Sequence, residues 1–379
     1  MGRNNPVSKI APHLTHSGVH DHGFNTVSTY GNLLRLMIEE KISHSDWEKR
    51  FYEMALKISG AVQAMRWTEI RDGGFIFSFN GKHSLFVDTI RSCRMLNISH
   101  RLGHFLGGEN DVKINLFHRA VRHLLATARY SIYYGEGRDV YDVAGRTAHE
   151  SIFNVADGNF PCPSSQQGYS PFSTWTRGLA WAMCGFAEQL EFVSTVDKDE
   201  FEVGIEKDDV LKILARAAMV TSDFYIENSC ADGIPFWDTG APGLRNIDLN
   251  GISNPHNDYE PVDSSAAAIG AQGLLRLGHY LTALGDSRGS RYTAAGLTIV
   301  RTLFSEPYLS IDPRHQGLIL HSVYHRPNGW DHVPTGRKIP CGESGMWGDY
   351  HARELGLMIQ RMLESENYYT FYNCVPRKA

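Results

Sequence analysis

Residues 171–190 read PFSTWTRGLAWAMCGFAEQL, and the second half of this stretch has the spacing of a buried α-helix. Its large apolar residues recur every three or four positions, which places them on one helix face. They are Leu179, Met183, Phe186, Leu190 and Val193. The pattern predicts a helix from Ser173 to about Val193 that is packed inside the protein.

The first turn of this helix has a different character. Ser173 or Thr174 is expected to cap it, because a hydroxyl can accept a hydrogen bond from a free backbone N–H. Arg177 and Trp181 are four residues apart and share a face, and Trp175 lies just before them. A guanidinium beside indole rings suits a flat, anionic, ring-shaped ligand. The alternative is a pair of core tryptophans with a solvated arginine.

Composition excludes several classes of function. The chain has 379 residues, 37 basic and 42 acidic, so its net charge of −5 gives no reason to expect a nucleic-acid or membrane partner. No apolar run approaches the roughly 20 residues that span a bilayer. Its six cysteines contain no CxxC pair, which argues against a zinc site and fits free thiols in a reducing compartment. We expect a cytoplasmic protein, or a periplasmic one if the true N-terminus is longer.

The rest of the chain predicts an array of helices. Residues 1–18 are expected to be irregular, and 19–379 to form one domain. A helical pattern leads to Ile38, and a further helix begins near Ser84. Other helices are expected at 46–65, 112–133, 208–227, 263–284, 291–304 and 345–364. Asp-Gly turns recur at Asp72, Asp157 and Asp232, each followed by a polar helix start. This repetition indicates α-hairpins in a ring, with a cleft at one end.

Asp88 is the strongest candidate for chemistry. It lies in the apolar run 85–90, LFVDTI, so we expect its carboxylate to be desolvated and its pKa raised. The alternative is that it pairs with Arg91 or Arg94 of its own helix.

Asp21 is the candidate for a second carboxylate of an acid–base site. Its alternative role is a helix N-cap. The histidines around it are His13, His16, His20 and His22, and we expect no metal there, because no matching ligand array accompanies them. His149, in a loop beside Arg146, is equally suited to anion recognition or proton transfer and to a structural hydrogen bond.

Several motifs together resemble those of the unsaturated glucuronyl hydrolases, glycoside hydrolase family 88. The segment STWTRGLAW at 173–181 is similar to the family signature. The other matching segments are HDHGF (20–24), LFVD (85–88), His149, Gln167-Gly168, DGIPFWD (232–238), DSSA (263–266), VYH (323–325) and WGDY (347–350). The likeness covers about residues 18–372.

The resemblance implies an all-α fold, an (α/α)6 toroid, and a hydrolase that needs no cofactor. The implied substrates are oligosaccharides left by polysaccharide lyases, which end in a C4=C5 unsaturated uronic acid. Asp88 would be the acid/base that protonates C4 and activates the water that attacks C5, and Asp21 would support it. The implied substrate-binding residues are His149, Gln167, Arg177, Trp175, Trp181, Phe79 in place of a stacking tryptophan, and His325.

The sequence departs from the family in its first part. Relatives usually have a helical hairpin before the HD-x-GF segment, and only about 18 residues precede it here. The ring lacks its first hairpin, or the start was assigned late, or another subunit fills the gap. Leu179 stands where relatives commonly have Gln, and Gln166 where many have His. Both changes are expected to affect sugar preference.

Three alternatives remain beside this interpretation. One is the related family 105, unsaturated rhamnogalacturonyl or ulvan-type hydrolases with the same toroid. The others are an epimerase, which would rely on a histidine pair, and an inactive carbohydrate-binding relative. The presence of both Asp21 and Asp88 favours the hydrolase. We expect a monomer or homodimer.

Overall fold

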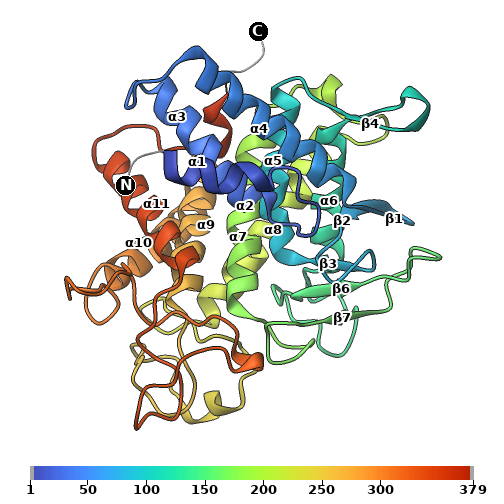
Figure 1. Ribbon diagram of the computed structural model, residues 1–379. Helices are drawn as coiled ribbons and strands as arrows, with labels where there is room; N and C mark the ends of the chain where they lie inside the picture. The colour runs from blue at the N-terminus through green and yellow to red at the C-terminus, as the bar shows by residue number, and fades with distance from the viewer. Residues whose placement is uncertain (1–3, 376–379) are drawn as a thin grey trace.

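The computed structural model describes residues 4–375, and most of its regular structure is α-helix (Figure 1). Helices pack side by side in an inner row and are covered by an outer row. The inner row contains α2 (His22–Thr26), the π-helical turn η2 (Val27–Gly31), α3 (Asn32–Ile38), the 3-10 helix η3 (Val87–Ser92), α5 (Cys93–Arg101), α7 (Thr176–Ser194), α9 (Ser264–Ala283) and α11 (Met346–Leu363). The outer row contains α4 (Asp46–Met65), α6 (Leu116–Tyr130), α8 (Lys207–Glu227) and α10 (Gly289–Leu303).

Short strands lie along one side of the ring (Figure 1). They form an antiparallel hairpin of β1 (Trp67–Ile70) and β2 (Gly73–Ile76), a three-stranded sheet in the order β3 (Ser84–Phe86), β6 (Glu150–Ile152) and β7 (Cys162–Ser164), and a pair of β4 (Leu106–Gly107) and β5 (Lys113–Ile114). In the three-stranded sheet Phe86 lies opposite Glu150. This pairing fixes the backbone directly before Asp88, where a helix was expected to begin near Ser84. The helix begins three residues later, at Val87, because residues 84–86 pair with β6.

The irregular lead expected at 1–18 is also partly wrong. Residues 4–10 form α1 (Asn4–Ile10), and a 3-10 helix, η1 (Ala11–His13), follows it. Pro12 lies in the first turn of η1, where the missing N–H costs nothing. Val7 and Ile10 pack against a core cluster formed by α3 and α4, which gives this short helix its support.

Local signals account for the helices whose bounds were predicted well. Ser45 and Glu48 form a capping box at the start of α4, which begins and ends where the sequence pattern predicted. The Asp263 carboxylate accepts hydrogen bonds from the backbone of Ser265 and Ala266 at the start of α9.

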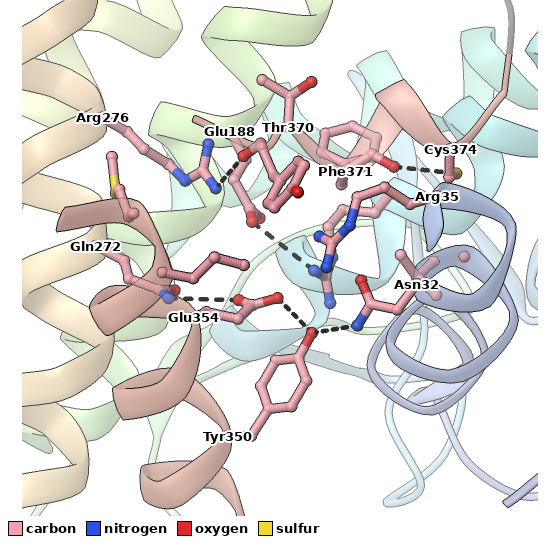
Figure 2. A pocket seen from close by; sticks show the side chains of 16 residues that line it. Asn32, Arg35, Glu188, Gln272, Arg276, Tyr350, Glu354, Thr370, Phe371 and Cys374 are labelled. Atoms are coloured by element: carbon pink, nitrogen blue, oxygen red, sulfur yellow. Dashed lines mark hydrogen bonds and ion pairs between the residues drawn. The ribbon is translucent and has the colours of Figure 1, made fainter. Parts of the chain in front are cut away.

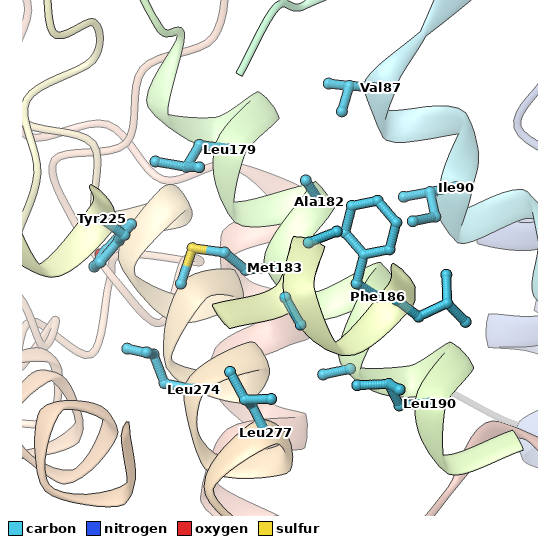
Figure 3. Packing of buried hydrophobic residues seen from close by; sticks show 14 of the residues in the cluster. Val87, Ile90, Leu179, Ala182, Met183, Phe186, Leu190, Tyr225, Leu274 and Leu277 are labelled. Carbon is cyan, nitrogen blue, oxygen red and sulfur yellow. The ribbon is translucent and has the colours of Figure 1, made fainter. Parts of the chain in front are cut away.

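Helix α7 is the centre of the hydrophobic core (Figure 3). Every residue from Thr176 to Val193 is buried, because η3, α8 and α9 surround it. A Cβ at Gly273 of α9 would stand 2.8 Å from the backbone nitrogen of Cys184, so glycine permits the two helices to approach closely. The helix that carries the signature residues is therefore held rigidly.

The ring closes between α11 and α3 through side chains rather than through another helix (Figure 2). The amide of Asn32 donates to the hydroxyl of Tyr350 (3.1 Å). The ring of Tyr369 lies between the guanidinium groups of Arg35 and Arg361, 3.9 and 3.5 Å from its centroid. The 3-10 helix η8 (Phe371–Cys374) then packs on α3 and α5. Within residues 4–375 no sixth inner helix lies in this gap.

None of the helices formed by residues 4–375 has both the length and the apolar character needed to cross a membrane. The expectation of one domain over 19–379 stays a prediction.

Candidate active site

A cleft of about 650 Å³ opens at the end of the ring where the inner helices begin. It is lined by six of the nine residues predicted for the site. They are Asp21, Asp88, Gln167, Trp175, Arg177 and Trp181. Segments more than 150 residues apart in sequence thus meet around one cavity of the size that binds small ligands.

Two carboxylates and a histidine form one corner of the cleft, which we name the carboxylate corner (His20, Asp21 and Asp88). The Nε2 atom of the buried His20 lies 3.4 Å from Oδ1 of Asp21 and 3.7 Å from Oδ1 of Asp88. Asp21 stands at the N-cap position of α2, but its side chain makes no capping hydrogen bond. Its carboxylate is 38% exposed and that of Asp88 is 13% exposed. The capping alternative for Asp21 is therefore not adopted.

The backbone of His20 is held from two sides. Its carbonyl accepts hydrogen bonds from the side chains of Gln63 on α4 (2.9 Å) and Ser92 on η3 (2.5 Å). The ring itself stacks on Phe79, with centroids 5.7 Å apart. These contacts fix the imidazole with its Nε2 atom facing both carboxylates.

Burial and the charges of the carboxylate corner together shift all three pKa values. Burial raises the pKa of Asp21 above 3.8, and the charge of Asp88 adds to this increase. Burial alone would lower the pKa of His20, but the two carboxylates outweigh it and raise that pKa above 6.5. Burial alone would raise the pKa of Asp88, but its interactions with His20 lower it below 3.8. The expected raised pKa of Asp88 was wrong, because an imidazole faces this carboxylate.

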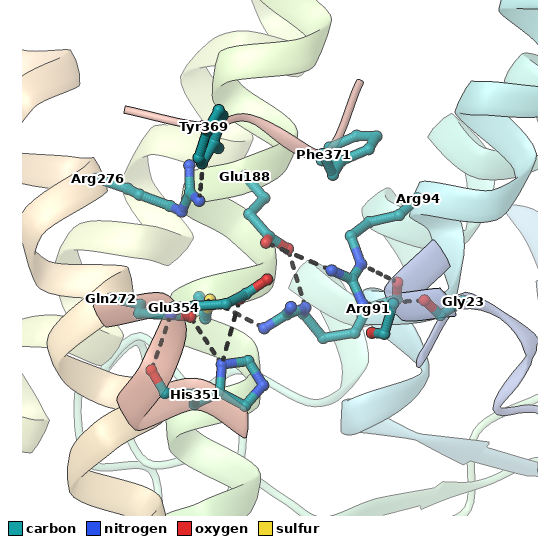
Figure 4. A network of polar contacts seen from close by, with 12 residues as sticks. Gly23, Arg91, Arg94, Glu188, Gln272, Arg276, His351, Glu354, Tyr369 and Phe371 are labelled. Carbon is teal, nitrogen blue, oxygen red and sulfur yellow. Dashed lines mark hydrogen bonds and ion pairs between the residues drawn. The ribbon is translucent and has the colours of Figure 1, made fainter. Parts of the chain in front are cut away.

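Arg91 and Arg94 do not pair with Asp88, so that alternative is not adopted either. They form a polar network with Glu188 of α7 (Figure 4), and Arg94 also lines the cleft. Arg91 Nε lies 2.9 Å from the Glu188 carboxylate, and its guanidinium faces the ring of Trp181 at 5.5 Å. Arg94 donates to the carbonyl of Gly23 (2.9 Å), two residues after Asp21. This network contacts both the Trp181 ring and the backbone beside Asp21.

Arg177 lies at the centre of a second group, which we name the arginine hub. Its guanidinium is 3.2 Å from the Asp263 carboxylate and also donates to the carbonyl oxygens of Val323 and Tyr324. A further N–H donates to Oε1 of Gln167 (3.0 Å). Sequence reasoning suggested an arginine free to bind an anion. The structure shows instead a buried arginine whose terminal nitrogens are satisfied by protein acceptors.

Gln167 and the two tryptophans form the wall beside the hub. Because Oε1 of Gln167 accepts from Arg177, the amide N–H groups of Gln167 are the part that can donate to a ligand. Trp175 and Trp181 are almost fully buried and line the cleft. Trp175 is also the N-cap residue of α7, in place of the expected Ser173 or Thr174.

His149 is buried behind this wall rather than in the lining of the cleft. Its ring lies 4.6 Å from those of Phe86 and Trp175. Its Nδ1 atom accepts hydrogen bonds from the backbone nitrogens of Gln166 and Gln167. Burial lowers the pKa of His149 to about 4, so it is neutral at pH 7. Of the roles considered for His149, a structural hydrogen bond fits its position better than anion recognition or proton transfer. The residue holds the loop of Gln167 in place.

Phe79 and His325 are the other two predicted residues outside the lining of the cleft. Phe79 is 48% exposed, and its ring stacks on that of His20. His325 is buried, and its Nδ1 atom caps a 3-10 helix, η7 (Arg326–Asn328), by accepting from the backbone of Asn328. A motif match alone suggested a substrate contact for His325, and its position indicates a structural role.

Sequence reasoning missed residues on two helices that line the cleft. From η2 and the preceding turn come Asn25, Ser28 and Thr29, and from α11 and its start come Met346, Trp347, Asp349, Tyr350 and Arg353. Asn25, Ser28 and Thr29 follow Asp21 at intervals of three or four residues. Helical spacing therefore places them on the same face as Asp21 and could have revealed them. The second group belongs to the WGDY motif, which was matched but not assigned a role.

Comparisons with known proteins agree with the motifs. No family model matches the chain. An unsaturated glucuronyl hydrolase of Formosa agariphila is 24% identical over 341 residues, which cover 88% of this chain and 68% of that relative. One from Bacillus sp. GL1 is 27% identical over 213 residues, which cover 56% of this chain and 46% of the relative, less than half its length.

The fold is also shared with solved structures. The unsaturated glucuronyl hydrolase of Bacillus sp. GL1 superposes with a TM-score of 0.70 at 20% identity, over 98% of this chain and 82% of that one. The enzyme of Streptococcus agalactiae gives a TM-score of 0.64 at 20% identity, over 98% and 75% of the two chains. The predicted α/α toroid is thus confirmed. In sequence and in fold, the chain is similar to the unsaturated glucuronyl hydrolases.

Proposed function

We propose that this protein is a glycoside hydrolase that removes the C4=C5 unsaturated uronic acid from the non-reducing end of oligosaccharides. The observation that carries the proposal is the carboxylate corner, where Asp21 and Asp88 flank His20 at the base of the cleft. The names of the relatives support it, since they are unsaturated glucuronyl and chondroitin disaccharide hydrolases. An inactive relative would have no need for two carboxylates in this arrangement.

The chemistry is hydration of a vinyl ether. A proton adds to C4 of the C4=C5 bond, and a water molecule adds its oxygen to C5 and gives up a proton. The hemiketal formed at C5 opens to a ketone and leaves C1 as a hemiacetal that still carries the neighbouring sugar. This hemiacetal then collapses to an aldehyde, the C1–O bond to the sugar breaks, and the sugar leaves as an alcohol with the proton of the C1 hydroxyl. The protein must therefore deliver one proton and accept another at adjacent carbons.

The carboxylate corner can divide these two tasks. Its lowered pKa keeps Asp88 ionised, which suits the acceptor of the proton from water. The raised pKa values of Asp21 and His20 favour a proton on those groups, which suits delivery to C4. Because the three groups interact, the proton belongs to the corner as a whole rather than to one residue. Asp88 remains the residue whose loss should affect catalysis most.

The wall opposite the corner supports binding of the uronate. Gln167 presents amide donors to the cleft, and the positive charge of Arg177 lies directly behind it. Trp175 and Trp181 contribute apolar surface for the sugar ring. Arg177 thus acts on the carboxylate through its field and through the orientation of Gln167.

An unsaturated disaccharide tests this function. Hydration removes the C=C bond, so the ultraviolet absorbance of that bond should decrease with time when protein is added. A folded protein that leaves the absorbance of every unsaturated uronate unchanged would contradict the proposal.

The cysteines bear on the location of the protein. The six cysteines are free thiols, and four of them, Cys93, Cys184, Cys230 and Cys374, are buried, which supports the cytoplasmic location that we propose. A monomer or homodimer, with a single domain over 19–379, stays a prediction. Light scattering after size-exclusion chromatography would distinguish the two assembly states.

A further inference from the structure

A second cavity lies between the inner helices of the ring (Figure 2). Side chains of α3, α5, α7, α9 and α11 line it, together with residues 369–371 and Cys374. Arg94 and Tyr350 line both this cavity and the cleft, so the two adjoin. We name it the central cavity.

The size of the central cavity limits what it can hold. Its volume is about 40 Å³. A water molecule needs roughly 10–15 Å³ by the same measure, so the cavity has room for roughly three particles of that size. A pyranose ring with its hydroxyls is several times larger. The cavity is therefore no extension of the sugar-binding cleft, but it can hold a monoatomic ion.

The two carboxylates that line the cavity already have partners. Glu188 lies 2.9 Å from Nε of Arg91 and 3.8 Å from a terminal nitrogen of Arg94. Glu354 accepts a hydrogen bond from the hydroxyl of Tyr350 (2.5 Å). These contacts offset the negative charge on this side of the cavity.

Arg276 reaches the cavity from α9 and is only 7% exposed. One terminal nitrogen lies 2.8 Å from the Glu191 carboxylate, and the other donates to the carbonyl of Tyr369 (2.9 Å). Its Nε atom has no hydrogen-bond partner among residues 4–375. An unpaired N–H of a buried guanidinium costs stability, which indicates that this donor meets a ligand.

Arg35 enters the cavity from α3, on the side opposite Arg276 (Figure 2). Its guanidinium packs on the ring of Tyr369, 3.9 Å from the centroid, and its buried Nε atom also lacks a hydrogen-bond partner among the described residues. The nearby Glu39 accepts from the hydroxyl of Tyr369 and pairs with Arg361 instead. The positive charge of Arg35 is thus left without a carboxylate.

Positive charge therefore exceeds negative charge around the cavity. Four arginines stand against three glutamates, namely Arg35, Arg91, Arg94 and Arg276 against Glu188, Glu191 and Glu354. Arginine does not lose its proton in proteins, so the excess is permanent. Burial, together with three of these arginines, holds the pKa of His351 well below 6.5, so this neighbour stays neutral. An anion is the ligand that such surroundings favour.

We infer that the central cavity binds one chloride ion, which accepts hydrogen bonds from the free N–H groups of Arg35 and Arg276. The ion would connect α3 to α9 across the ring, beside the gap that only side chains close. No step of the proposed hydration uses this site, so the inference stands apart from the function of the cleft.

Thermal unfolding in chloride tests the inference. The native protein is compared in sodium chloride and in sodium gluconate at equal ionic strength, because gluconate is too large for the cavity and screening is then the same. Chloride at tenfold its Kd should raise Tm by about 2 °C. Crystals of the native protein grown in sodium bromide should show an anomalous-scattering peak in the central cavity.

Variants assign the effect to the cavity. Arg35→Met should abolish the dependence of Tm on chloride, and Glu354→Gln should shift it to lower chloride concentrations. Arg119→Met is the matched control, because Arg119 packs on Trp67 (4.8 Å) and lies outside the lining. It should keep the full dependence, even where Tm itself is lower.

The inference fails if chloride and gluconate give the same Tm, or if bromide binds only outside the central cavity. It also fails if folded Arg35→Met keeps the chloride dependence of the native protein. Where Arg35→Met does not fold, the bromide peak in the native protein and the shift in Glu354→Gln decide the question.

Discussion

The two charged groups of the cleft are built in opposite ways. In the arginine hub, each terminal nitrogen of Arg177 has protein acceptors, and the charge is paired with Asp263. In the carboxylate corner, both ring nitrogens of His20 and Oδ1 of Asp88 lack hydrogen-bond partners among residues 4–375. A satisfied group holds structure, whereas an unsatisfied buried group costs stability and is available for chemistry. The comparison separates residues that position from residues that react.

Substitution in the carboxylate corner should have the largest effect. Asp88→Asn removes the proton acceptor with almost no change in shape, so we expect kcat to fall by about a thousandfold. Substrate binding should be kept, as measured by calorimetry. Asp142→Asn, on a surface loop, is the control and should keep full activity. Normal turnover by Asp88→Asn would show that the corner does not carry the reaction.

Substitution in the hub should affect the fold instead. Arg177→Met leaves the buried carboxylate of Asp263 without its ion pair, which should lower the free energy of unfolding by about 3–5 kcal/mol. Denaturant unfolding measures this loss. Asp88→Asn should lose less stability, because His20 keeps its contact with Asp21 and can release its proton when the Asp88 charge is removed. If Arg177→Met keeps native stability and loses only substrate affinity, the arginine is a ligand contact rather than a hub.

The pH dependence of activity should report on His20. Its pKa is raised in the folded protein, so its proton is fully present at low pH and is lost as pH rises through a value above 6.5. The contribution of this proton to stability disappears over the same interval. We expect kcat/KM to decline over that interval, and His20→Gln should lack this decline. An unchanged profile in the variant would assign the proton to another group.

Among these substitutions, we expect the smallest effect on activity from a change at Gln167, which lies between the arginine hub and the cleft. Gln167→Ala removes amide donors from the cleft wall but leaves Arg177 with its other acceptors. We expect KM to rise about tenfold, the value of one hydrogen bond to a charged group, with stability unchanged. A comparable loss of kcat would indicate that Gln167 acts on the reacting atoms.

Much of the fold was predictable because its signals are local. The capping box at Ser45 and Glu48 defined α4, and the Asp263 cap defined α9. The start of α7 was placed wrongly because its hydroxyls have other partners. Thr174 accepts from the backbone of Thr147, and Ser173 from that of Ser170. The contact with Thr147, which lies 27 residues away in the sequence, leaves no trace in helical periodicity.

The members of the site were easier to predict than their roles. Asp21, Asp88 and Arg177 were all located from sequence, but their charge states depend on neighbours that only the fold supplies. The imidazole of His20 reverses the shift expected for Asp88. Arg177 donates hydrogen bonds to the carbonyl groups of Val323 and Tyr324, which belong to a segment nearly 150 residues away in the sequence.

The closure of the ring by residues 369–375 has a consequence for biosynthesis. Cys374 and Val375 complete the apolar cluster around Tyr30 and Leu34 of the first inner segment. At roughly 5–20 residues per second, the ribosome makes the closing segment roughly 15–70 s after that cluster has been translated. During this time apolar surface of the nascent chain is uncovered. We therefore expect chaperone depletion to reduce the yield of soluble protein.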